Sequence, residues 1–147
     1  MHTEGTFSAR GDPERAFEFF CDPRQVLDCL DDPHTVEVGD PTHFTGTVTS
    51  GVAFIRGTFR ITGEYTEIER PRRVAVKLHG SGMGSGLDAT LVTTFEVHDG
   101  VTAVHWIADL ALSGPVASVG ERLIRGTIST KTQTLFARAR ERLEARA

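Results

Sequence analysis

The sequence predicts an α+β domain in which a curved antiparallel sheet wraps around one long C-terminal helix. Alternating segments rich in Val, Ile, Thr and Phe follow one another between residues 34 and 112, as in consecutive strands. After Pro115 no further proline occurs, and apolar residues recur there at helical intervals. A helix of that length cannot bury its apolar stripe alone, so the sheet must supply the surface that it covers.

Two Asp-Pro pairs predict two short helices directly after a first strand. Residues 2–10 are the predicted strand. Asp12 and Asp22 suit the N-cap position of a helix, and the proline after each suits the first helical turn. The apolar side chains of both segments are expected to face the interior.

Six further strands complete a predicted seven-stranded sheet. Asp99-Gly100 has the residue types of a two-residue hairpin turn, and Gly39-Asp40-Pro41 and Arg70-Pro71-Arg72 predict further turns. Strands joined by such short loops pair as an antiparallel meander. Glycines inside the strands are where the sheet is expected to bend or bulge. The predicted strands are 34–38, 43–50, 54–69, 72–80, 87–98 and 101–112.

The closing helix is predicted to run unbroken from Pro115 over roughly 45 Å. Gly114, Gly120 and Gly126 predict a close approach between helix and sheet, or else a point at which the helix flexes to admit a ligand. The helix is rich in arginine, whereas the first 40 residues are acidic. We expect the arginines to form a solvated face, with an acidic partner or an anionic membrane as the alternative.

Composition predicts one globular domain over residues 1–147. Apolar residues make up 39% of the chain and charged residues 24%, as in ordinary globular proteins, and the net charge of −4 argues against nucleic acid as a partner. No apolar run approaches the roughly 18 residues of a membrane span. We expect Cys21 and Cys29 to be reduced, and the protein to be cytoplasmic with at most peripheral contact at the inner face of the membrane.

The polar residues do not form a recognisable catalytic or metal-binding motif. The six histidines are scattered and lack metal-ligand spacing, so we expect no metal and no cofactor. The Gly-rich run at 80–86 lacks the lysine of a phosphate loop and predicts a bend or a flexible rim. His105 and Asp109 share one strand face and could form a polar couple, although a solvent-exposed outer face is the expected position.

Apolar residues on the other strand faces form the candidate binding site. If Trp106 faces inward, alternation brings side chains from three further strands to the same concave face. Such apolar concavities bind small molecules, and a solidly packed core is the alternative. A polar head group could be held by Tyr65, a threonine or the helix arginines. The candidate ligand-binding residues are Phe59, Ile61, Tyr65, Val76, Leu78, Leu91, Phe95, Trp106, Leu110, Val119 and Leu123.

Several local motifs, together with the order of elements, resemble one known family. They are Gly5-Thr6-Phe7, Asp22-Pro23 with the Val26-Leu27 and Cys29-Leu30 pairs that follow, the Gly-rich run 80–86, and Ser113-Gly114 with Gly120 six residues after Gly114. Essentially end to end, the sequence resembles the carbon monoxide dehydrogenase CoxG family of the START or birch-pollen-allergen (SRPBCC) superfamily. The resemblance implies a helix-grip fold.

Two features depart from the family pattern. Asp31-Asp32-Pro33 stands where the family usually has a Pro-Gly pair, and the sequence stops at Ala147, where many members continue into a membrane-anchoring extension. We therefore expect any membrane contact to be peripheral.

The resemblance also implies a function. It favours an open cavity and a non-catalytic protein that binds a lipid-like or quinone-like molecule. Its implied partner is a molybdenum-containing carbon monoxide dehydrogenase-type hydroxylase, which it would serve in maturation, membrane recruitment or electron acceptor supply. Two alternatives stay open. A polyketide cyclase or dehydratase would need an acid or base in the pocket, and a protein-interaction module would act through the arginine-rich helix.

Overall fold

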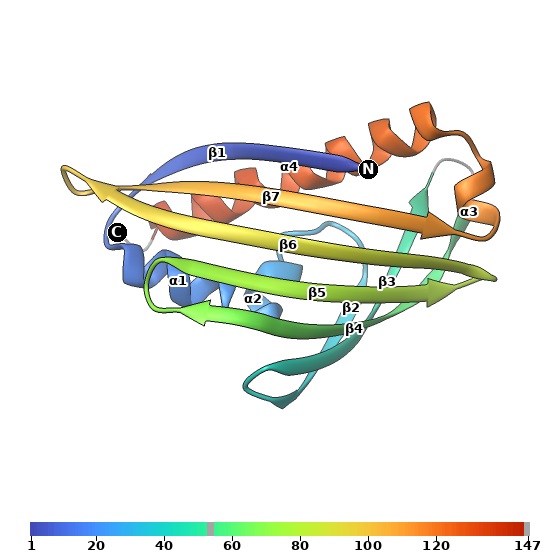
Figure 1. Ribbon diagram of the computed structural model, residues 1–147, viewed down its shortest axis with the longest axis horizontal. Coiled ribbons are helices and arrows are strands. Elements are labelled where there is room, and N and C mark those ends of the chain that lie inside the picture. The colour runs from blue at the N-terminus through green and yellow to red at the C-terminus, as the bar shows by residue number, and fades with distance from the viewer. Residues whose placement is uncertain (53–54, 146–147) are drawn as a thin grey trace.

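The strands form one antiparallel sheet, as predicted, in a computed structural model that describes residues 1–52 and 55–145. Within these residues the sheet has seven strands in the order β1-β7-β6-β5-β4-β3-β2 (Figure 1). The predicted start of one strand at residue 54 lies outside the described residues. The strands are β1 (His2–Arg10), β2 (His34–Asp40), β3 (His43–Val52), β4 (Ile55–Glu69), β5 (Arg73–Gly82), β6 (Ser85–His98) and β7 (Val101–Ser113).

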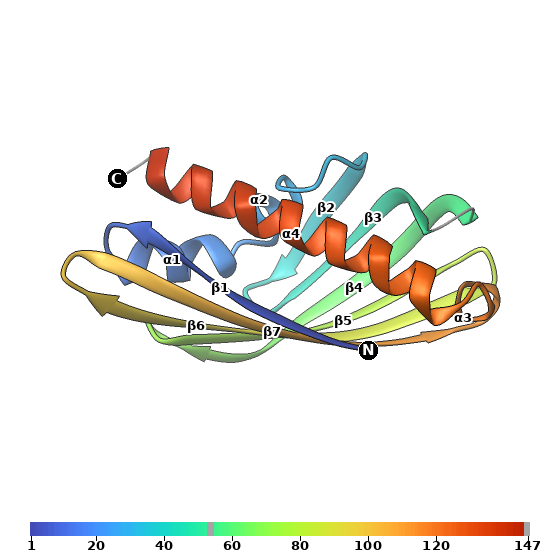
Figure 2. The same ribbon diagram turned by 90° about the horizontal axis from the view of Figure 1, so that it is seen from above.

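All helices of the described residues lie on the concave side of the sheet. They are α1 (Pro13–Phe20), α2 (Pro23–Leu27), α3 (Pro115–Ser118) and α4 (Glu121–Ala145). Figure 2 shows α4 crossing above the curved strands, with α1 and α2 beside its C-terminal half. The N-caps are confirmed, since the carboxylates of Asp12 and Asp22 accept the backbone N–H groups of Glu14 and Arg24. The α+β class and the helix-grip arrangement are therefore confirmed.

Two hairpin turns have the same backbone geometry. Asp99 and Gly100 have φ angles of 52° and 76°, which confirms the predicted two-residue turn. Met83 and Gly84 have the same pair of values, so the Gly-rich run 80–86 is the tip of the β5–β6 hairpin. Because this turn needs only two residues, β5 and β6 extend further toward it than predicted.

The predicted long C-terminal helix is confirmed as α4, but it begins at Glu121 and not at Pro115. The segment after Pro115 forms two helices, α3 and α4, instead of one. Between them Gly120 has a φ of 119°, which a right-handed helix does not allow. The 25 residues of α4 span roughly 37 Å. Within α4, Ile124 is buried whereas Leu123 is 58% exposed, because Ile124 lies four residues before Ile128 and shares its face, and Leu123 does not.

The helix glycines do not all mark a close approach to the sheet. A Cβ at Gly114 would lie 2.4 Å from the carbonyl oxygen of Gly84. The segment that leads into α3 is therefore in close contact with the tip of the β5–β6 hairpin. At Gly120 and Gly126 nothing lies within 4 Å of an added Cβ. The predicted close approach is therefore confirmed at Gly114 and wrong at the other two positions.

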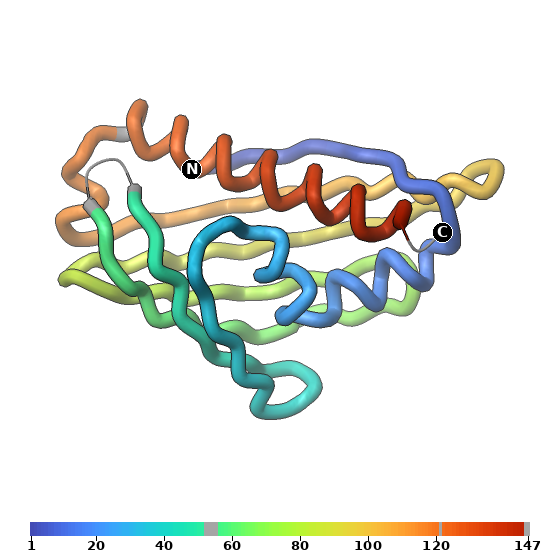
Figure 3. Tube along the Cα trace, turned by 180° about the vertical axis from the view of Figure 1, so that it is seen from behind, coloured from blue at the N-terminus to red at the C-terminus, as the bar shows by residue number. Residues whose placement is uncertain are grey.

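An aromatic cluster fixes the C-terminal half of α4 on the sheet. Phe136 of α4 stacks on Trp106 of β7, with ring centroids 4.4 Å apart and planes 5° apart. Gly5 of β1 pairs with Trp106, and a Cβ at Gly5 would lie 2.7 Å from the indole ring. Phe20 of α1 contacts Phe136 and also Phe95 of β6. These rings fill this end of the domain. Figure 3 shows that α1 lies beside the C-terminal half of α4 there.

Substitution of Gly5 by alanine should destabilise the protein, because the new methyl group would push the indole ring out of its stack. We expect a loss of about 1–3 kcal/mol in the free energy of unfolding, measured by urea denaturation. The matched control is Gly126→Ala, at an exposed helical position with open space around it. That variant should gain about 1 kcal/mol from helix propensity. Equal stability of the two variants would contradict the role assigned to the stack.

Candidate ligand-binding cavity

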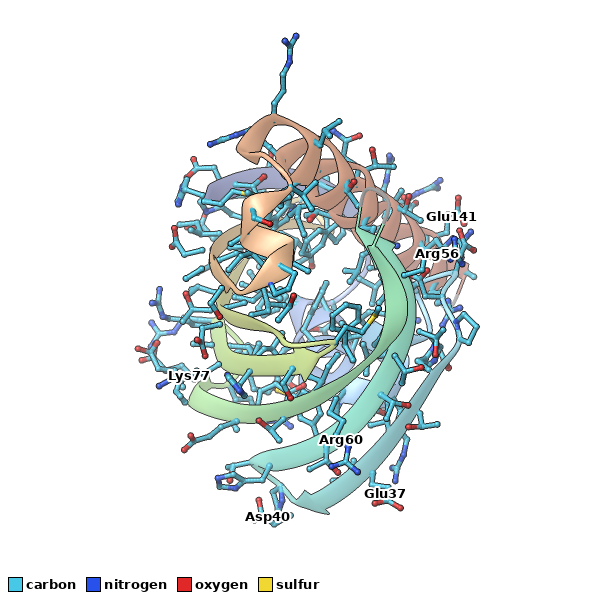
Figure 4. The ribbon with its side chains drawn as sticks, turned by 90° about the vertical axis from the view of Figure 1, so that its right-hand side faces the viewer. Glu37, Asp40, Arg56, Arg60, Lys77 and Glu141 are labelled. Atoms are coloured by element: carbon cyan, nitrogen blue, oxygen red, sulfur yellow. The ribbon has the colours of Figure 1, made fainter. Side chains whose placement is uncertain are left out.

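A cavity of about 300 Å³ lies between the sheet and the N-terminal half of α4. It extends to the α3 end of the domain, which faces the viewer in Figure 4. In Figure 2 this is the end at which α1 and α2 no longer lie between α4 and the strands. Its walls come from the end of α1, from α2 with the loop after it, from β3 to β7, and from α3 and α4. The cavity thus begins where the aromatic cluster ends.

The lining is almost entirely apolar. The polar exceptions are Asp32, Ser50, Ser85, Thr93 and Lys131. The remaining lining residues are Phe20, Pro23, Val26, Leu27, Leu30, Phe44, Val48, Phe59, Ile61, Tyr65, Val74, Val76, Leu78, Gly80, Gly86, Leu87, Leu91, Leu112, Val116, Ile128 and Leu135. Alternation within the strands explains the strand contributions, since residues two apart in one strand share the concave face.

The structure brings part of the predicted site together. The predicted residues that line the cavity are Phe59, Ile61, Tyr65, Val76, Leu78 and Leu91. They come from β4, β5 and β6, in which the predicted alternation matches the observed inner face.

Five predicted residues lie outside the lining. Phe95 and Trp106 are on the inner face but belong to the aromatic cluster, which leaves no space beside them. Leu110 of β7 is half-buried away from the cavity. Val119 falls in the break between α3 and α4. Leu123 points to solvent because it lies five residues before Ile128 and therefore on another face of α4. These five do not form part of the proposed site.

The wall formed by α2 and β3 was missed by the sequence prediction. Val26, Leu27 and Leu30 were expected to face inward, and they do so against the cavity rather than a solid core. Phe44 and Val48 of β3 show the same alternation as the other strands, which could have placed them at the site. Ile128 belongs to the apolar stripe that predicted the closing helix, whereas no sequence signal indicated that Lys131 of α4 reaches the cavity.

Most polar groups at the cavity already have partners. Tyr65 donates its hydroxyl proton to the Phe20 carbonyl at 3.0 Å, and burial raises the pKa of this phenol. The Ser85 hydroxyl accepts the N–H of Val116 at 3.0 Å. The hydroxyl proton of Tyr65 is therefore not free to hold a head group, contrary to the expectation from the sequence.

Basic side chains of α4 hold the acidic loop, Asp28–Asp32, which follows α2. Lys131 Nζ lies 2.8 Å from an Asp32 carboxylate oxygen, and Arg138 forms an ion pair with Asp31. Arg142 donates to the Asp28 carbonyl at 2.9 Å. These three contacts correct the expectation of a purely solvated basic face. The three contacts join α4 to the acidic loop, and this loop forms part of the cavity wall because Asp32 and Lys131 both line the cavity.

His34 at the start of β2 binds the same loop. Its Nδ1 lies 2.8 Å from the Asp32 carbonyl oxygen, and its Nε2 lies 2.9 Å from an Asp28 carboxylate oxygen. The hydrogen bond to Asp32 first, and then the one to Asp28, raise the pKa of His34 above 6.5. The doubly protonated ring is thus the form that binds the loop best.

Other polar clusters lie outside the cavity. Asp109 lies on the exposed surface, as expected, and forms a 2.6 Å hydrogen bond with His2 and not the possible couple with His105. His79 and Asp88 pair at 2.8 Å, also at the surface. In residues 1–52 and 55–145, no three His, Cys, Asp or Glu side chains are grouped as a metal site would require. No helix in that part of the chain has the length and hydropathy to cross a membrane.

Comparison with known proteins identifies one family model. The carbon monoxide dehydrogenase CoxG model matches residues 5–144. None of the curated proteins matches the sequence.

Solved structures share the fold at low identity. A conserved protein from Geobacillus kaustophilus is 19% identical with a TM-score of 0.86, over 97% of this chain and 95% of that chain. The ZhuI aromatase/cyclase from Streptomyces sp. R1128 is 12% identical with a TM-score of 0.67, over 100% of this chain and 98% of that chain. Ara h 8.0201 is 13% identical with a TM-score of 0.68, over 99% of this chain and 98% of that chain. At these identities the likeness shows the fold alone.

Replacement of His34 by asparagine should weaken the fold more at pH 5 than at pH 8. A raised pKa means that the protonated ring stabilises the folded state fully below the unfolded pKa of 6.5, and that this stabilisation is lost as the pH rises through the folded value. Asparagine can keep the donor toward Asp32 but carries no charge. Urea denaturation at both pH values measures the difference.

The control for this prediction is His98→Asn, which changes an exposed histidine at the end of β6, away from the acidic loop. A loss of stability in His34→Asn that is the same at both pH values would contradict the charged contact.

Proposed function

Because this chain belongs to the carbon monoxide dehydrogenase CoxG family, we propose that it binds a hydrophobic small molecule, lipid-like or quinone-like, between the sheet and α4. The observation that carries the proposal is the apolar cavity of about 300 Å³. Core side chains normally fill such space to crystal density, so an open apolar cavity of this size favours a ligand.

Apolar burial supplies the affinity in this proposal. Each methylene group removed from water contributes about 0.8 kcal/mol, and the lining offers apolar contacts on every side. Affinity should therefore rise with ligand chain length until the cavity is full. The proposed ligand-binding residues from the predicted set are the six that line the cavity: Phe59, Ile61, Tyr65, Val76, Leu78 and Leu91.

A binding role is favoured over catalysis by the state of the polar lining residues. General acid–base chemistry needs a titratable group placed against the substrate. Asp32 and Lys131, the charged residues of the lining, neutralise each other at 2.8 Å. The ionic contacts of α4 with the acidic loop likewise support a structural role for much of its basic face, and so weigh against a module that acts through this helix.

The family provides the proposed cellular context. In this proposal the protein serves a molybdenum-containing carbon monoxide dehydrogenase-type hydroxylase, in its maturation, membrane recruitment or electron acceptor supply. A carrier of a lipid-like or quinone-like molecule would exchange its ligand with a membrane, so peripheral membrane contact forms part of the proposal.

A leucine at position 80 should fill the cavity and block binding. Gly80 lines the cavity from β5, and an added Cβ would have its nearest neighbours at 3.6 Å, an ordinary contact distance. The dissociation constant of the fluorescent hydrophobic probe N-phenylnaphthylamine should rise about tenfold or more, since its buried contact area is lost. Fluorescence titration measures the constant, and thermal denaturation should show a folded variant.

The matched control is Gly126→Leu, which makes the same change on the exposed side of α4. It should bind the probe as the unchanged protein does. Probe binding that is unchanged in Gly80→Leu, or that is lost equally in both variants, would contradict the assignment of the cavity as the binding site.

A further inference from the structure

We propose that Ser50 binds a neutral carbonyl or hydroxyl group of the molecule that occupies the cavity. This inference rests on the proposed function and specifies the class of ligand. In the described part of the chain, the Ser50 hydroxyl is the buried side-chain polar group that lacks a hydrogen-bond partner. Ser50 is only 7% exposed, and it is one of the residues that line the cavity.

The position of Ser50 in β3 aims its side chain at the cavity. Phe44 and Val48 precede it on the same strand face, and both line the cavity. Gly57 of β4 is the strand partner of Ser50, and a Cβ there would lie 2.0 Å from the sulfur of Met83. Directly paired residues share a face, so the Met83 thioether covers the inner face beside Ser50. The hydroxyl thus lies among apolar groups.

An unpaired buried hydroxyl destabilises a fold, and so it indicates a function or a missing partner. A ligand oxygen in the cavity would satisfy the Ser50 group. Ser85 and Tyr65, by contrast, already use their hydroxyls in hydrogen bonds to the Val116 amide and the Phe20 carbonyl. Ser50 therefore gives a polar ligand group a defined position in an otherwise apolar site.

The charges around the site select a neutral group. Figure 4 shows Arg56, Arg60 and Lys77 on the outside of the strands, pointing away from the cavity. Lys131 lines the cavity but is already neutralised by Asp32. Burying a carboxylate or phosphate without a cation is strongly unfavourable. A serine hydroxyl donates and accepts, so it suits a carbonyl as well as a hydroxyl.

The test compares dodecanol with dodecanoate as competitors of N-phenylnaphthylamine at pH 8. The unchanged protein should bind the alcohol more tightly than the carboxylate. Ser50→Ala should weaken alcohol binding about fivefold, the effect of one neutral hydrogen bond, with little change for the probe. Ser50→Thr keeps a hydroxyl and should restore the preference for the alcohol.

Ser81→Ala is the matched control, because it removes an exposed serine hydroxyl of β5 that does not line the cavity. It should leave both the melting temperature and the preference for the alcohol unchanged. Ligand-free Ser50→Ala should melt at the same temperature as the unchanged protein or higher, since it removes an unpaired group.

Two results would overturn the role of Ser50: alcohol binding that is equally tight in Ser50→Ala, or a preference of the unchanged protein for dodecanoate. In either case the proposed function stands as long as the probe binds in the cavity. Failure of the unchanged protein to bind the probe and both competitors would instead refute the proposed function.

Discussion

The stack of Phe136 on Trp106 is the contact on which the rest of the domain depends. It fixes the C-terminal half of α4 against β7 through two rings whose centroids are 4.4 Å apart, and Gly5 makes room for the indole on the edge strand. The phenylalanines of α1 fill the space between the sheet and the C-terminal half of α4. Beyond α1 no such filler exists among the described residues, and α2, the curved strands and α4 surround an apolar cavity instead.

Charge makes the second attachment of α4. Lys131, Arg138 and Arg142 bind the acidic loop Asp28–Asp32, and His34 binds it from β2. The uneven charge of the sequence, acidic near its start and basic near its end, is thus partly satisfied within the molecule. One wall of the cavity is therefore joined to the helix by ion pairs, which salt weakens more than it weakens apolar packing.

Alternation and turn chemistry were enough to predict the sheet, and local patterns also predicted six cavity residues in β4, β5 and β6. The failures depend on tertiary position. Apolar spacing continues across Gly120, so it could not reveal that the helix breaks there. Trp106 shares its strand face with cavity residues, and only Phe136 and Gly5, distant in sequence, place it in the solid core. Ser50 sits in a strand of threonines and glycines and has no distinguishing signal.

The proposed function requires that a hydrophobic ligand binds between the sheet and the first half of α4. The most direct test follows the NMR chemical shifts of methyl groups during titration with dodecanol. We expect large shift changes at Leu78, Leu91 and Ile128, which line the cavity, and none at exposed Leu123 and Val97. Changes confined to the exposed methyl groups, or no saturable change at all, would contradict binding in the cavity.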